Sequence, residues 1–76
     1  MKELVEYMVR ALVDEPDSVR VETSEGGNVT IYEVSVAPGD LGKVIGRHGR
    51  IANALRSVLK AAAMRTDERA TIEIIS

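Results

Sequence analysis

Val44-Ile45-Gly46-Arg47-His48-Gly49-Arg50-Ile51-Ala52 is the stretch of sequence that most constrains the fold. Apolar pairs on both sides of the two glycines favour helices there, and the glycines favour a tight turn between these helices. Because glycine has no Cβ, a phosphate can approach the backbone N–H groups of such a turn. The second helix begins at the turn, with unpaired N–H groups and the positive end of its dipole. We therefore predict a loop that receives the backbone of a polyanion.

The segments before and after this loop have clear helical or extended patterns. Residues 3–14 place their apolar side chains on one helical face, and Pro16 ends that helix. Polar and apolar residues alternate from Val19 to Thr23 and again over about 29–37, around a turn cluster at 24–28. This pattern is typical of a β-hairpin. We further expect a short helix at 41–45, the loop at 46–49, a long helix at 50–65, and a last strand in which Ala70, Ile72 and Ile74 alternate.

The predicted order is α-β-β-α-α-β, an α+β fold with helices on one face of a three-stranded sheet. Val29 and Ile31 fall on the face opposite to Tyr32 and Val34, so either the second strand bulges near residue 31 or two apolar side chains lie outside the core. Asp40 is predicted to cap the short helix. The core stripe of the long helix is predicted to be Ile51, Leu55, Leu59 and Ala62, with Val58 and Ala63 near its edges.

Length and composition indicate one small globular domain over residues 1–76. Apolar residues make up 45% of the chain, which argues against disorder, and there is no cysteine for a disulfide or a thiolate metal site. Glu3 and Glu6 interrupt the N-terminal apolar pattern, so we expect no signal peptide and a cytoplasmic protein. We expect neither a metal nor a cofactor.

Charge is distributed unevenly along the chain. The net charge of −2 conceals a sum of −5 over residues 1–39, +5 over 40–65 and −2 over 66–76. The positive charge therefore lies in the same segment as the glycine turn, which is typical of a surface that binds a polyanion. A helix that is basic only to remain soluble is the alternative explanation.

The loop and the order of elements resemble K-homology (KH) domains of the bacterial type II arrangement. As one domain that covers nearly the whole chain, the sequence is most similar to the KhpA family of small bacterial RNA-binding proteins. The resemblance implies a GxxG loop that grips single-stranded RNA, and a role as a post-transcriptional regulator or RNA chaperone. It also implies self-association, or pairing with the larger KH protein KhpB. KH patterns commonly place a branched apolar residue where this chain has Ala52.

We assign roles to the residues of the predicted site on this basis. Gly46 and Gly49 allow close approach and set the loop conformation, and bases would lie in an apolar groove lined by Ile45, Ala52 and part of the second strand. The RNA-binding candidates are Lys43, Ile45, Gly46, Arg47, His48, Gly49, Arg50 and Ala52, with Asn53, Arg56 and Lys60 as further candidates. Candidates for self-association are Ala54, Val58 and Ala61.

Other functions have less support in the sequence. The two glycines would also suit a plain helix–helix turn. Gly39-Asp40-Leu41-Gly42-Lys43 lacks the spacing of a nucleotide-binding P-loop, and Val44 stands where such loops carry a magnesium-binding hydroxyl. Since no pair of nucleophile and base is apparent, we expect no enzymatic activity. The alternative function is a protein-interaction module in which RNA binding is secondary.

Overall fold

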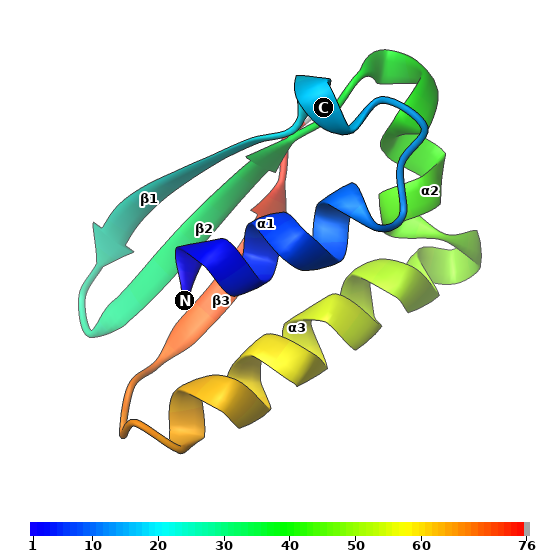
Figure 1. The fold of residues 1–76 in the computed structure, drawn as a ribbon. Coiled ribbons are helices and arrows are strands. Elements are labelled where there is room, and N and C mark those ends of the chain that lie inside the picture. The colour runs from blue at the N-terminus through cyan, green and yellow to red at the C-terminus, as the bar shows by residue number, and fades with distance from the viewer. Residues whose placement is uncertain (76) are drawn as a thin grey trace.

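The computed structural model describes residues 1–75, and within them three helices and three strands follow one another in the predicted order (Figure 1). Short 3-10 turns precede β1, α2 and α3. The elements are α1 (Lys2–Arg10), β1 (Arg20–Gly26), β2 (Val29–Ser35), α2 (Leu41–Ile45), α3 (Arg50–Met64) and β3 (Ala70–Ile74). None of the helices in this described part is long and apolar enough to cross a membrane.

The three strands form one mixed sheet in the order β1-β2-β3. β1 and β2 pair antiparallel, with Val21 opposite Val34, as the predicted hairpin requires. β3 pairs parallel to β2, with Ile72 opposite Tyr32. Both α1 and α3 cover the same face of this sheet, which confirms the predicted two-layer α+β arrangement (Figure 1).

The core lies between these helices and the sheet. Val5 and Val9 of α1 and Leu59 of α3 are almost completely buried against Val34 and Ile72 of the sheet. Because successive strand residues point to opposite faces, every second residue of β2 enters this core.

The buried face of α3 is turned about the helix axis relative to the face that we predicted. Leu55 and Leu59 are buried as expected, but the other buried positions are Ala52 and Ala63. Ile51 and Ala62, which we expected there, are only half-buried. Small side chains at 52 and 63 allow the helix to approach its neighbours closely, and the longer Ile51 side chain covers the glycine turn instead.

The placement of two apolar residues of β2, Val29 and Ile31, was open in the sequence analysis. The pairing of β1 with β2 runs without interruption from Arg20–Ser35 to Gly26–Val29, so the second strand contains no bulge. Ile31 is half-buried outside the core, and the half-buried Val29 lies at the first residue of β2, near the last turn of α3. The strand therefore has no bulge, and the two apolar side chains lie outside the core.

Candidate nucleic-acid interface

A glycine is required at position 46, where α2 ends and the loop begins. Its backbone has φ 75° and ψ 171°, a conformation that is essentially restricted to glycine. A Cβ at this position would lie 2.6 Å from Cγ1 and 2.9 Å from the backbone N of Ile51. The absence of a Cβ at Gly46 thus allows the start of α3 to pack closely against the loop.

The tip of the loop turns through two consecutive residues with positive φ, His48 (58°) and Gly49 (73°). Around Gly49, the position of an added Cβ is open space, so its role is to set the backbone conformation. Gly49 also occupies the N-cap position of α3, where it supplies no side-chain acceptor for the first N–H groups of the helix. These groups therefore lack a side-chain partner and are suited to an anion.

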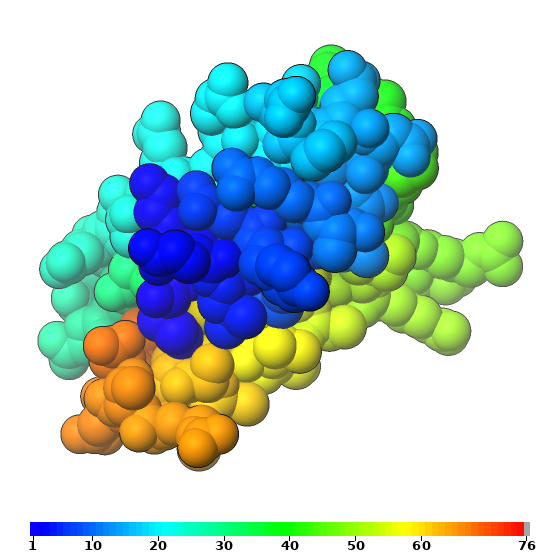
Figure 2. All heavy atoms as spheres, in the orientation of Figure 1, coloured from blue at the N-terminus to red at the C-terminus, as the bar shows by residue number. Residues whose placement is uncertain are grey.

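Arg47, His48 and Arg50 project from this turn into solvent. All three side chains are exposed, and within residues 1–75 none of them forms an ion pair or a side-chain hydrogen bond. Figure 2 shows the segment between α2 and α3 as yellow-green atoms that extend from the body of the molecule at the right. The structure thus brings together the predicted cations of the loop and leaves them accessible.

Among the described residues Lys43, unlike Arg47, His48 and Arg50, forms ion pairs within the protein. Its Nζ lies 3.1 Å from Asp14 Oδ2 and 3.6 Å from Asp40 Oδ1. The hydrogen bond and charge of Asp14, followed by the charge of Asp40, raise the pKa of the Lys43 ammonium. Lys43 therefore joins α2 to the segment that follows α1, and its charge is already partly neutralised within the protein.

Asp40 is not the helix cap that we predicted, since its side chain makes no capping hydrogen bond to α2. Its carboxylate is buried at 3% exposure and accepts hydrogen bonds from the backbone N–H groups of Asp14 (3.2 Å) and Glu15 (3.0 Å). Burial by itself raises the pKa of this carboxyl, but the two N–H donors and Lys43 outweigh burial and lower it. Because these N–H groups donate to Asp40, the first helix cannot extend to residue 14 and ends at Arg10.

The remaining loop candidates lie beside the turn. Ile45 is half-buried, Asn53 is exposed, and Ala52 is buried at 5% exposure, so the Ala52 methyl group lies mostly beneath the surface. Arg56 Nε donates to the carbonyl oxygen of Ile72 (2.9 Å), and Arg56 Nη1 donates to Asn53 Oδ1 (3.2 Å). Arg56 thus connects α3 to β3.

The strand that borders this region is β3, which corrects our expectation of the second strand. β2 is central, with both of its edges paired, whereas one edge of β3 has no neighbouring strand. Arg69 O and the Ile75 N–H bond to β2, so in this parallel ladder Ala70, Ile72 and Ile74 direct their N–H and C=O groups to the free edge. The parallel pairing of β3 with β2 depends on tertiary packing, and the local sequence pattern does not indicate it.

The residues proposed for self-association form a separate exposed patch on α3. Ala54, Val58 and Ala61 recur at helical spacing and are exposed, and Val58 is 50% exposed despite its apolar side chain.

Comparison with known proteins identifies relatives over the full length of the domain. A family model described as KhpA/KhpB, KH domain matches residues 2–74. The chain is 51% identical over 75 residues to the RNA-binding protein KhpA of Clostridium acetobutylicum, which covers 99% of this chain and 100% of that protein. It is 52% identical to RNA-binding protein KhpA of Halalkalibacterium halodurans, covering 99% of both chains.

A solved structure shares the fold. The chain superposes on part of a crystal structure of Aquifex aeolicus Era bound to GDP·AlF4⁻ with a TM-score of 0.66, at 19% sequence identity. The match covers 95% of this chain but only 28% of that one. At this identity the likeness concerns the fold alone.

Proposed function

This chain belongs to the KhpA/KhpB family of KH domains, and we propose that it clamps single-stranded RNA through its GxxG loop. The observation that carries the proposal is the exposed turn in which Arg47 and His48 have no internal partner within residues 1–75. The relatives named above are RNA-binding proteins by name. A GxxG loop of this kind clamps the backbone of about four nucleotides.

In the proposed complex, the phosphates lie at the loop. Arg47, His48 and Arg50 supply donors and positive charge, and the uncapped N–H groups of α3 add backbone donors. Lys43 is a positioning residue, because Asp14 and Asp40 already hold its ammonium group.

The bases face the side of the loop where α3 adjoins the free edge of β3. There the edge-facing backbone groups of Ala70 and Ile74 offer donors and acceptors to base edges, next to the half-buried Ile45, whereas the Ile72 carbonyl accepts from Arg56. The chain has only two aromatic residues, Tyr7 and Tyr32, and Tyr32 is 7% exposed, so stacking on aromatic rings does not dominate. The role that we propose for this RNA binding is that of a post-transcriptional regulator or RNA chaperone.

The test is RNA binding by the double variant Arg47→Asp/His48→Asp. Both side chains are exposed, so the fold should remain intact by circular dichroism while affinity for a short single-stranded RNA is lost. Lys2→Asp/Arg65→Asp, which changes exposed residues outside the loop, is the matched control and should bind nearly as well as the natural chain. Equal affinity in the folded loop variant and the natural chain would remove the loop from the mechanism.

A second candidate function is protein interaction, favoured by the exposed patch of Ala54, Val58 and Ala61. An apolar side chain flanked by small residues on an exposed helix face suits contact with another helix. We propose that this patch pairs with a second copy or with a larger KH protein of the KhpB kind.

Val58→Lys should convert a dimer into a monomer without unfolding it, since a charge would be buried in the contact. Ser18→Lys, at an exposed position outside α3, is the control and should leave the dimer intact. Analytical ultracentrifugation gives the mass of each protein. The same mass for natural chain and Val58→Lys would exclude the patch as an interface.

A further inference from the structure

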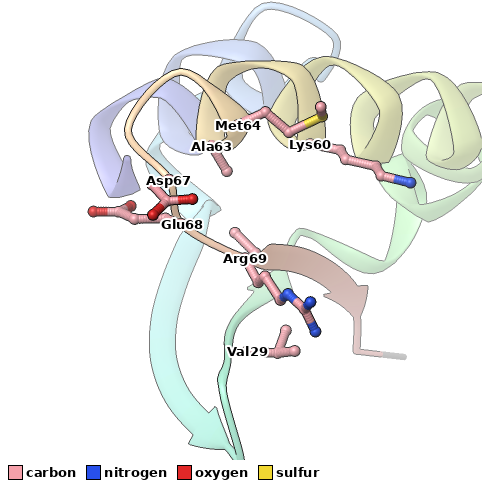
Figure 3. A pocket seen from close by; sticks show the side chains of 8 residues that line it. Val29, Lys60, Ala63, Met64, Asp67, Glu68 and Arg69 are labelled. Carbon is pink, nitrogen blue, oxygen red and sulfur yellow. The ribbon is translucent and has the colours of Figure 1, made fainter.

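A cavity of about 580 Å³ opens at the end of α3 that is remote from the GxxG loop (Figure 3). It lies between the last turn of α3, the connection to β3 and the first residue of β2. Its walls include Val29, Lys60, Met64, Glu68 and Arg69. None of these residues belongs to the loop.

The walls of the cavity combine apolar surface with two cations. Val29, Ala63, Met64 and Ala70 contribute apolar atoms, and Met64 is 70% exposed. In Figure 3 the Lys60 ammonium and the Arg69 guanidinium extend to one side, whereas the Asp67 and Glu68 carboxylates extend to the other. Neither cation forms an ion pair in the part of the chain that the structure describes. A nucleotide offers matching chemistry, since its base is a flat apolar ring and its phosphate is an anion.

Lys60 in the cavity wall lies on the same face of α3 as residues of the proposed RNA site. Gly49, Asn53, Arg56 and Lys60 are spaced by four, three and four residues, so they lie on one stripe of the helix. The hydrogen bond from Arg56 Nε to Ile72 O places this stripe beside the free edge of β3. From Gly49 to Lys60 the stripe is about 16 Å long, at 1.5 Å per residue. A strand that leaves the loop along β3 therefore reaches Lys60 and then Arg69.

We propose that the RNA strand continues beyond the four nucleotides held at the loop and is anchored a second time at Lys60 and Arg69. This inference rests on the proposed function and concerns the length of RNA that the domain holds. Arg69 becomes an RNA contact that the sequence pattern did not indicate, and Lys60 becomes a phosphate contact at the far end of the site. The apolar cavity floor receives a base of the extended strand.

The test compares labelled single-stranded RNAs of four and of about eight nucleotides by fluorescence anisotropy. The natural chain should bind the longer RNA more tightly. Lys60→Glu/Arg69→Glu should lose this gain and keep the affinity for the shorter RNA. For the longer RNA, the slope of log affinity against log salt should become shallower by about 1.4, at about 0.7 for each lost phosphate contact. Lys2→Glu/Arg65→Glu, which changes net charge equally outside the cavity, should retain the gain.

Two results would overturn the second anchor: an unchanged gain with length in Lys60→Glu/Arg69→Glu, or an equal loss for both RNAs. If charge reversal disturbs folding, Lys60→Gln/Arg69→Gln gives the same comparison with a smaller change. Failure of the proposed function has a different result, because the natural chain would then bind neither RNA.

Discussion

At Gly46 an added Cβ would meet Ile51 from two sides, 2.6 Å from its Cγ1 and 2.9 Å from its backbone N. The Ile51 side chain can therefore cover the turn only because residue 46 has no Cβ. The start of α3 at this point has the same requirement. His48 and Gly49 add a second constraint, since both have positive φ. The backbone conformation of the loop is therefore restricted by its own residues.

Gly46→Ala should lower the free energy of unfolding by about 2–4 kcal/mol, from strained backbone and overpacking against Ile51. Gly42→Ala is the matched control. Its Cβ would meet nothing within 4 Å and its φ is ordinary, so this helical substitution should be neutral or stabilise by up to about 1 kcal/mol. Urea unfolding measures both values. Equal stability of the two variants would contradict the proposed packing of Gly46.

At the scale of elements, a buried carboxylate holds α2 against the segment that follows α1. Asp40 accepts the N–H groups of Asp14 and Glu15, and Lys43 spans from Asp40 to Asp14. α2 has only five residues and begins directly after Asp40. Its orientation, and with it the start of the loop, depends on this contact.

Asp40→Asn should lower the free energy of unfolding at neutral pH. It should also make this free energy fall less steeply as the pH is lowered. Because the pKa of Asp40 is lowered in the folded state, its contribution is present above the unfolded pKa, near 3.9. It is lost as pH falls through the lower folded pKa. Thermal unfolding between about pH 2 and 6 checks this, with the exposed Asp17→Asn as control. Parallel pH curves for the natural chain and Asp40→Asn would contradict a stabilising role of the charge.

Element order and the loop were predictable because they depend on local patterns. The alternation around residues 24–28 indicated the hairpin, and the two glycines indicated the turn between helices. The end of α1 and the role of Asp40 were not predictable, because a carboxylate 26 residues away from Asp14 competes for its backbone N–H. The pairing of β3 was also not predictable, since only the folded sheet shows that β2 is central and that β3 is an edge strand.

At the scale of the molecule, charge is divided between two faces. Glu22, Glu33 and Glu73 are neighbours in register across all three strands, on the face away from the helices. Exposed cations lie at the loop, namely Arg47 and Arg50, and on α3 at Lys60. An approaching polyanion is thus repelled by the outer sheet face and attracted to the loop, although the net charge is −2.

Clamping of phosphates by the loop is tested by the salt dependence of affinity for a 5′-phosphorylated four-nucleotide RNA, whose terminal phosphate and three linkages supply the phosphates. If about four phosphates are neutralised, log affinity should fall against log salt with a slope near −3. The slope should become much shallower in Arg47→Asp/His48→Asp. A flat salt response of the natural chain, or the same slope in both proteins, would contradict phosphate clamping by this loop.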